Sequence, residues 1–331
     1  MEPNTVSLND VPGAVGALHD AQVDIFYRPE VSLREGAGRN FSKTPSKPQR
    51  FVEHVAAAAL APYVRIRSDF EALENADFER AHTAAYVEAF FAGREPYARS
   101  NGLAWSRAFA ESVRYTSASL VHAVNGAIAN PRRVTLSPTG GFHHARPSGG
   151  GGFCTFSGQV IAAVRAYERH GAVGAWVDLD GHFGNSIEDS REFAPVLNQA
   201  VPQAVHINPS GTGQRYLESL REGLDRVGEH VLSGAVTYVA FAHGADSHVW
   251  DQLRGQCSTA QWLCASQLVY SAIADWSRHL RRPVPVVLAL FGGYRDDDPR
   301  SVLELHAADL AIALATLGGA PIEYTPVVTR P

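Results

Sequence analysis

Two aspartates and a histidine stand at alternate positions in the stretch Gly174 to Asn185, which reads GAWVDLDGHFGN. The stretch begins with an apolar run without helical spacing, which is typical of a buried parallel strand. In an extended chain Asp178, Asp180 and His182 begin on one face, and carboxylates that close repel unless a cation or hydrogen-bond donors compensate them. One oxygen and one imidazole nitrogen are half of a divalent-metal site, so a third ligand must come from elsewhere. Alternatively, Asp178 caps the next element and His182 is an ordinary loop histidine.

Three other segments also place polar side chains directly after a predicted strand. They contain His143 and His144 in GGFHHA, Asp246 in HGAD, and Tyr294 after Gly292 and Gly293. An open parallel α/β sheet carries its ligand crevice at the carboxyl ends of its strands. Independent structural roles would not be expected to collect on that edge. We therefore expect these segments to converge on the stretch from Asp178 to His182.

Asp246 is the candidate for the missing metal ligand. With Asp180 and His182 it would offer two oxygens and one nitrogen and leave a position for water, as catalytic Zn²⁺ requires. Fe²⁺ or Mn²⁺ would suit the same oxygen-rich set. Alternatively, Asp246 caps the turn after its strand. The neighbouring His243 and His248 are left outside the site, as residues that could be ordinary surface histidines.

Imidazole takes and returns protons near neutral pH, so His143 and His144 are the candidate proton carriers. A buried histidine needs an acceptor for its far nitrogen. Asp178 is a natural acceptor for one of the pair, and Asn185 could serve the other. A carboxylate favours imidazolium and an amide does not, so the two pKa values should be driven apart. Alternatively, the pair are loop residues without a chemical role.

The phenol of Tyr294 can be aimed at the open metal position. There it would stabilise the oxyanion that forms when water attacks a carbonyl. A tyrosine after a strand is more often a packing residue, but the two glycines before this one favour a close approach of the backbone.

Strands and helices alternate along the whole chain, with no internal repeat and no dividing linker. The apolar patterns predict strands over 24–27, 63–66, 133–136, 175–177, 205–207, 235–242 and 284–290. They predict helices over 51–63, 78–91, 101–130, 157–170, 214–232, 259–280 and 301–317. This pattern predicts an α/β fold with a doubly wound, mainly parallel sheet flanked by helices. Residues 1–20 are expected to be loosely ordered, residues 21–331 to form a single domain, and the aperiodic stretch 30–48 to lie near the mouth of the site.

Composition narrows the function. Of 331 residues, 45% are hydrophobic, which supports a real core, and the net charge of −5 gives no reason to expect nucleic-acid binding. Three cysteines without a C-x-x-C pair argue against a disulfide framework. The N-terminus lacks the features of a signal peptide, and no apolar run is long enough to span a bilayer. We therefore expect a cytoplasmic protein without a membrane partner.

The motifs, taken together and in order, resemble those of the histone deacetylase family within the arginase–deacetylase superfamily. They are GGFHHA from Gly140, GFC from Gly152, DLDGHFGN from Asp178, GAD from Gly244 and GGY from Gly292. The resemblance implies a zinc-dependent amidohydrolase of the arginase–deacetylase fold that removes acyl groups from amines. It implies zinc ligands at Asp180, His182 and Asp246, a histidine pair at His143 and His144 supported by Asp178 and Asn185, and a carbonyl-polarising Tyr294. It also implies that Phe153 walls a tunnel for acyl-lysine, and that the Gly152 carbonyl accepts the amide N–H.

Several departures concern substrate recognition. The family usually has a second histidine where this chain has Phe183, and the loop Asn208 to Gly213 lacks the phenylalanine of the opposite tunnel wall. Phe183 and Gly293 therefore join Gly152 and Phe153 as candidate substrate-contacting residues. Many members also bind a monovalent cation such as K⁺ near the aspartates corresponding to Asp178 and Asp180. They use a serine whose place here is matched to Ala204, which puts that ion in doubt.

The preferred hypothesis is a hydrolase acting on N-acyl-lysine in proteins or peptides. One alternative is an acetylpolyamine amidohydrolase, whose cationic substrates the negative net charge would tolerate. Another, of a different class, is a non-catalytic protein that binds an acyl ligand or a partner. Ureohydrolase chemistry is disfavoured because the paired-metal motif SxDxDxxDP is absent.

Overall fold

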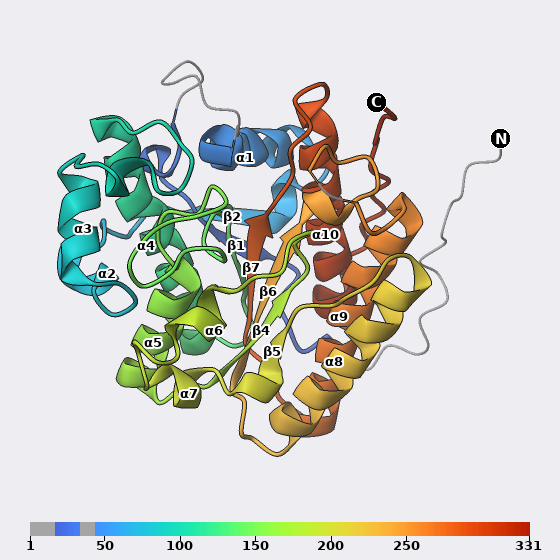
Figure 1. Cartoon of the computed structure of the whole chain (residues 1–331). Helices are drawn as coiled ribbons and strands as arrows, with labels where there is room; N and C mark the ends of the chain where they lie inside the picture. Colours follow the sequence, from blue (N-terminus) through green and yellow to red (C-terminus); the bar gives the residue numbers. More distant parts are fainter. Residues whose placement is uncertain (1–16, 34–43, 254) are drawn as a thin grey trace.

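The computed structural model describes residues 17–33, 44–253 and 255–331 (Figure 1). Within them seven strands form one sheet, in the order β2-β1-β3-β7-β6-β4-β5. Every pair of neighbouring strands is parallel. The strands are β1 (Val23–Phe26), β2 (Val64–Arg67), β3 (Val134–Ser137), β4 (Gly174–Asp178), β5 (His206–Ile207), β6 (Tyr238–Gly244) and β7 (Val286–Phe291). The predicted parallel α/β fold is confirmed.

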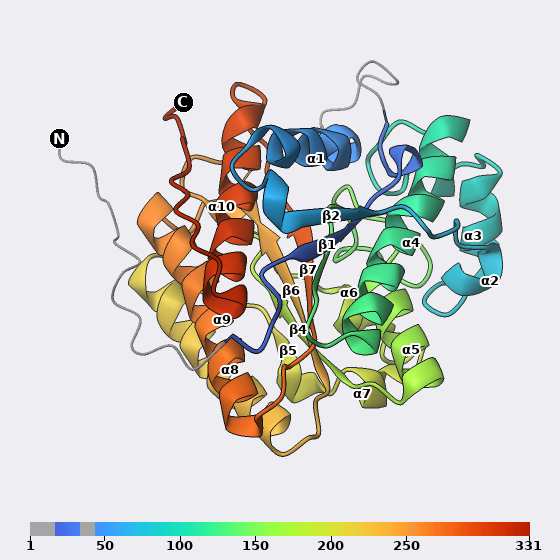
Figure 2. The ribbon, with the colours of Figure 1, turned by 180° about the vertical axis from the view of Figure 1, so that it is seen from behind.

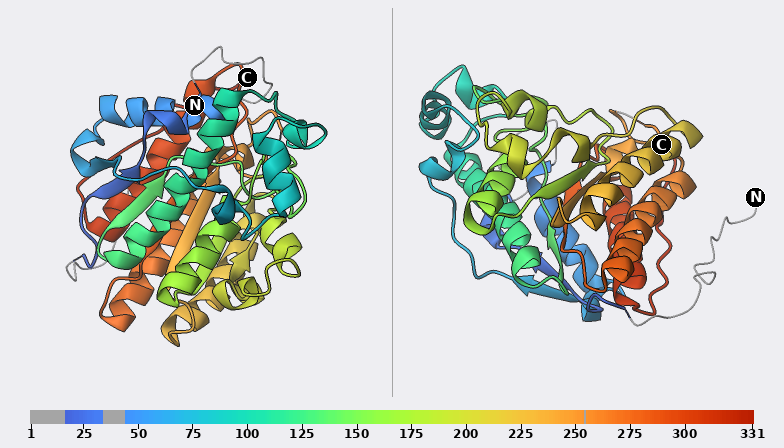
Figure 3. Two further views of the ribbon diagram at one scale, coloured as in Figure 1. Left: turned by 90° about the vertical axis from the view of Figure 1, so that its left-hand side faces the viewer. Right: turned by 90° about the horizontal axis from the view of Figure 1, so that it is seen from below.

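Helices cover both faces of this sheet. They are α1 (Lys47–Ala57), α2 (Asn75–Phe78), α3 (Ala84–Phe91), α4 (Arg107–Ala129), α5 (Gly158–His170), α6 (Ser186–Ser190), α7 (Leu197–Ala200), α8 (Gln214–Leu232), α9 (Thr259–Leu280) and α10 (Pro299–Gly318). Seen from below, α8, α9 and α10 form one layer and α4 and α5 the other (Figure 3). From behind, α1 lies beside the upper part of α10 (Figure 2).

Alternation along each strand divides the apolar side chains between two cores. In β4, Ala175 and Val177 belong to the core under α8, α9 and α10, whereas Trp176 belongs to the core under α4 and α5. Successive side chains of a strand point to opposite faces, so a sheet covered on both faces needs apolar residues at every position. This explains why the strands read as continuous apolar runs.

Most predicted elements match, but the predicted helix over 78–91 is wrong. The chain forms α2 and α3 there, separated by a turn. The side chain of Thr83 accepts a hydrogen bond from the amide of Tyr86 and so starts α3 anew. The preceding His82 is fully buried. Its Nε2 accepts from the amide of Ser157, and its Nδ1 therefore donates to the carbonyl of Arg146.

The last helix differs from the expectation in another way. By length and composition, α10 could cross a membrane, although 83% of its apolar window is buried inside the fold. The sequence does not show one unbroken apolar run here, because Glu304, His306 and Asp309 stand among the apolar residues. All three are buried, so the helix packs on every side, as a core helix does.

Two predicted segments fall largely outside the described residues. Residues 1–16 of the predicted loose N-terminus and residues 34–43 of the predicted mouth loop are among those not described. Where the description begins, His19 is buried, and its Nε2 lies 2.9 Å from the carbonyl oxygen of Val284. The end of the second segment forms a short 3-10 helix, Thr44–Ser46, directly before α1.

Candidate active site

The strands that carry the predicted site residues are neighbours in the sheet. Their order is β3, β7, β6 and β4, and each of the four chemical segments directly follows one of them. Asp178 is the last residue of β4, and Asp246 lies in the short 3-10 helix Ala245–Ser247 that follows β6. The carboxyl ends of these parallel strands therefore bring together segments that lie far apart in the sequence.

Asp180, His182 and Asp246 form a cluster whose ligand atoms all lie within 4.8 Å of one another. His182 Nδ1 lies 2.9 Å from Asp246 Oδ2 and 3.2 Å from Asp180 Oδ1. Both aspartates are buried, and His182 is partly exposed. Main-chain amides hold the carboxylates in place: Gly181 donates to Asp246 Oδ1 at 3.0 Å, and His182 donates to Asp180 Oδ1 at 2.9 Å.

The electrostatics of this cluster favour a cation. Burial, together with the charge of Asp180, raises the pKa of Asp246 to about 6. Hydrogen bonds to Asp180 and Asp246 raise the pKa of His182 to about 10. Two buried carboxylates that close need positive charge between them. The donor set, two oxygens and one nitrogen, fits a divalent transition metal.

The two adjacent histidines have different partners. His143 Nδ1 lies 2.9 Å from Asp178 Oδ2, and His144 Nδ1 lies 2.8 Å from Asn185 Oδ1. Their ring centroids are 4.1 Å apart. Asn185 in turn donates to Asp189, which fixes its amide so that the oxygen faces His144. Asp178 and Asn185 are thus the partners expected from the sequence.

Their pKa values are driven in opposite directions. Burial alone would lower the pKa of His143, but the charges of Asp180 and Asp178 outweigh it and raise the pKa to about 9. Burial and the nearby charge of His143 lower the pKa of His144 to about 4. His144 is therefore neutral near pH 7, with its proton on Nδ1 and a free lone pair on Nε2.

Tyr294 faces the cluster from the end of β7. Its ring centroid lies 6.4 Å from that of His182 and 5.7 Å from that of Phe153. Burial, with the charges of Asp180 and Asp246, raises the pKa of Tyr294 well above its ordinary value. The phenol therefore keeps its proton and can donate a hydrogen bond.

Of the residues predicted at a substrate channel, Gly152 lies beside His144 and Phe153 lies beside Tyr294. Phe153 adopts a φ of +62°, and its amide donates to the carbonyl of Asn101 at 2.9 Å. A Cβ atom at Gly152 would lie 2.5 Å from Cδ2 of His144, so only glycine fits there. The carbonyl of Gly152 already accepts a weak hydrogen bond from the thiol of Cys154. Phe183 is 64% exposed, and its part in a channel stays a prediction, as does that of Gly293.

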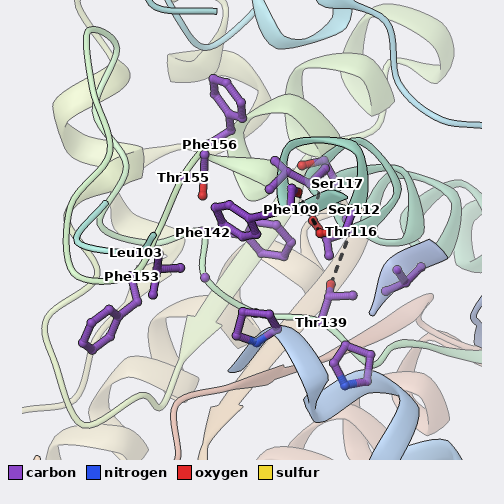
Figure 4. A pocket seen from close by; sticks show the side chains of 16 residues that line it. Leu103, Phe109, Ser112, Thr116, Ser117, Thr139, Phe142, Phe153, Thr155 and Phe156 are labelled. Carbon is purple, nitrogen blue, oxygen red and sulfur yellow. Dashed lines mark hydrogen bonds between the residues drawn. The ribbon is translucent and has the colours of Figure 1, made fainter. Parts of the chain in front are cut away.

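A mainly apolar cavity lies behind the loop that leads to the histidines (Figure 4). On one side α4 supplies Phe109, Ser112 and Thr116, and on the other the chain from Thr139 to Phe142 closes it. Phe153 also lines it. None of the three candidate metal ligands does.

Sequence reasoning missed two residues that hold the turn before Tyr294. Lys47, at the start of α1, is buried and donates to the carbonyls of Phe291 and Gly292 at 2.9 and 2.6 Å. Burial lowers its pKa to about 8 although Asp246 and Asp180 oppose the shift. Asp251 accepts a 2.6 Å hydrogen bond from the amide of Tyr294. Nothing in their local sequence distinguishes them from other lysines and aspartates.

Three other residues differ from the expectation. His243 and His248 are buried, not at the surface. His243 stacks on Trp262 with ring centroids 3.7 Å apart. Ala204, matched to the cation-binding serine, is exposed in the 3-10 helix Gln203–Val205 before β5. The side chain that reaches the region of Asp178 from the end of β5 is that of Asn208.

A family model of the histone deacetylase domain matches residues 42–198, just under half of the chain. Residues 42–198 are therefore similar to the histone deacetylase domain. The matched stretch includes the histidine pair, Asp180 and His182, whereas Asp246 and Tyr294 lie beyond it and are brought to the site by the sheet. The resemblance seen in the motifs is confirmed.

Two histone deacetylases are similar to this chain over a short segment of sequence, and one solved structure is similar to it in fold. Histone deacetylase 8 of Xenopus tropicalis is 32% identical over 66 residues, which are 20% of this chain and 18% of that protein. Histone deacetylase 8 of Xenopus laevis is 32% identical over 66 residues, 20% of each protein. The match thus spans about a fifth of these relatives. The crystal structure of the HDA15 HD domain shares the fold, with a TM-score of 0.68 over 93% of this chain and 91% of that chain at 16% identity.

Proposed function

We propose that the protein is a metal-dependent amidohydrolase that removes acyl groups, acetyl in particular, from the Nε atom of lysine side chains. The observation that carries the proposal is that one edge of the sheet joins a three-ligand metal cluster, a histidine pair with opposite pKa shifts and a protonated phenol. Those are the parts that hydrolysis of an unactivated amide requires.

Asp180, His182 and Asp246 would hold the ion, and the fourth position would remain open, as in catalytic zinc sites. When bound, Zn²⁺ supplies Lewis acidity toward the amide carbonyl and toward the attacking water. Fe²⁺ and Mn²⁺ suit the same donors. The rings of Tyr294 and His144 lie 6.4 and 6.0 Å from that of His182, so a substrate bound at this cluster would meet both side chains.

The side chains divide the proton transfers among themselves. His144 takes a proton from the attacking water at Nε2, because Asn185 engages its Nδ1. His143, held as imidazolium by Asp178, gives a proton to the departing amine. The phenol of Tyr294 donates a hydrogen bond to the carbonyl oxygen as negative charge develops there. Phe153 beside Tyr294 supplies an apolar wall for the aliphatic part of the substrate.

The test is hydrolysis of a substrate panel by protein loaded with Zn²⁺. The panel contains acetyl-lysine, longer acyl-lysine and trifluoroacetyl-lysine peptides, and acetylated putrescine. Preference for a lysine peptide supports the proposal, and preference for acetylputrescine assigns the protein to small amines instead. No hydrolysis of any amide by protein shown to contain metal would overturn the proposal and favour a binding role.

A further inference from the structure

A chain of hydrogen-bonded side chains leads from α6 to the main chain beside the histidine pair. The guanidinium of Arg191 donates to both carboxylate oxygens of Glu188, at 2.6 and 2.8 Å. His206 Nδ1 lies 2.9 Å from Glu188 Oε1, and His206 Nε2 lies 3.1 Å from Asn208 Nδ2. At the far end, the amide of Gly184 donates to Asn208 Oδ1 at 2.8 Å.

The direction of every hydrogen bond in this chain is determined. The Gly184 amide can only donate, so the oxygen of Asn208 must face it and the NH₂ group must face His206. His206 Nε2 is then an acceptor, and its proton stands on Nδ1, which donates to Glu188. Hydrogen bonds with Arg191 and His206 lower the pKa of Glu188 to about 2, so this acceptor stays ionised.

Gly184 lies where its position affects both histidines. A Cβ atom there would lie 2.3 Å from Asp178 Oδ2, 3.0 Å from His143 Nδ1 and 3.2 Å from Asn208 Oδ1. No side chain fits in this space, so the backbone itself packs against the Asp178–His143 pair. The next residue, Asn185, holds His144, and the amide of Ser186 donates to the carbonyl of His143 at 2.8 Å.

We infer that Asn208 is a positioning residue that fixes the segment Gly184 to Ser186 and, through it, the geometry of both histidines. The role belongs to the acceptor oxygen of the side chain. This oxygen fixes Gly184, while the NH₂ group donates to His206, which Glu188 orients, and so prevents the side chain from turning over. The inference rests on the proposed function, because the histidines matter only if they transfer protons.

The first test measures hydrogen exchange at the amide of Gly184, which needs no activity. In Asn208→Ala this amide should exchange at least about tenfold faster, because its acceptor is gone. In Asn208→Asp it should stay protected, because a carboxylate oxygen still accepts. Gln203→Ala, an exposed change on the same segment, is the matched control. Unchanged exchange in Asn208→Ala overturns the inference.

The second test measures kcat and KM of the same variants at equal metal content. Asn208→Ala should lose roughly tenfold in kcat with KM within about twofold, because misplaced proton carriers slow the reaction more than they weaken binding. Asn208→Asp should recover most of the loss. If Asn208→Ala does not fold, His206→Leu, which frees the amide but keeps its oxygen, should give a partial loss. Normal kcat in a variant with fast Gly184 exchange overturns the inference. An inactive wild-type protein overturns the proposed function instead. In that case the exchange result alone decides whether Asn208 holds Gly184.

Discussion

Gly292 packs directly against the carboxylate of Asp246: a Cβ atom at Gly292 would lie 1.9 Å from Oδ1 and 2.8 Å from Oδ2. Its φ of +35° is also one that residues with side chains rarely adopt. The turn that carries the phenol therefore touches a candidate metal ligand. A change in the turn should be felt at the metal as well as at Tyr294.

We expect Gly292→Ala to weaken metal binding by at least about tenfold, because Asp246 must move to make room for the methyl group. Competition with a chromophoric chelator measures the affinity. Gly149→Ala is the matched control, since its new Cβ would find no heavy atom nearer than 4.0 Å. Wild-type affinity in a folded Gly292→Ala variant would show that the carboxylate need not stand where the structure places it.

Asp180→Ala and Asp246→Ala should each abolish retention of metal, because two remaining ligands are too few for a stable catalytic site. Elemental analysis of the purified proteins gives the metal content per chain. Asp225→Ala, at an exposed position on α8, should keep full occupancy. Stoichiometric metal in either site variant would place the ion elsewhere in the molecule.

Tyr294→Phe should keep its metal and lose turnover by about a hundredfold to a thousandfold, as expected when a donor to a developing oxyanion is removed. Tyr167→Phe is a suitable control, because the Tyr167 phenol donates to the exposed Gln199 and stands outside the candidate site. The decisive quantity is kcat at equal metal content. Near-normal kcat would remove Tyr294 from the mechanism.

His82 should make the protein less stable in acid. Burial lowers its pKa to about 4 in the folded state, whereas the unfolded chain keeps a value near 6.5. Between these pH values the unfolded state binds more protons, so the free energy of unfolding falls as the pH falls from 6.5 to 4. The loss attributable to His82 is about 3 kcal/mol at most.

Urea unfolding at several pH values tests this expectation. His82→Gln can keep an acceptor for the amide of Ser157 but does not titrate in this range, so its stability should depend less steeply on pH than that of the wild type. Equal slopes for the two proteins would mean that His82 does not remain neutral on folding. His170→Gln serves as the control, since His170 is exposed.

The sequence is enough to predict the sheet, most helices and the chemical residues, because those features repeat a local pattern. Apolar runs mark strands, and the polar residues directly after them mark the edge of the sheet that carries the site. Asp180, His182 and Asp246 could therefore be assigned to one site from the sequence. The contacts of Lys47 could not, because it bonds Gly292 across 245 positions. The break before α3 was missed for a related reason: it depends on His82 reaching Arg146 and Ser157, which helix propensity does not contain.

Asn208 shows the same limit within the site. Its role depends on the register of β5 against β4, where Val177 pairs with Ile207 and so places Asn208 next to Asp178. Counting along the sequence alone led to Ala204, four residues earlier and on the surface. Strand register, set by packing of the whole sheet, decided the difference.

His182 and Phe183 are adjacent in the chain, yet one points at the metal cluster and the other is 64% exposed. At this point a single peptide unit separates a candidate metal ligand from a side chain that faces solvent. We therefore expect substitution of Phe183 to change substrate preference while the candidate metal ligands stay in place.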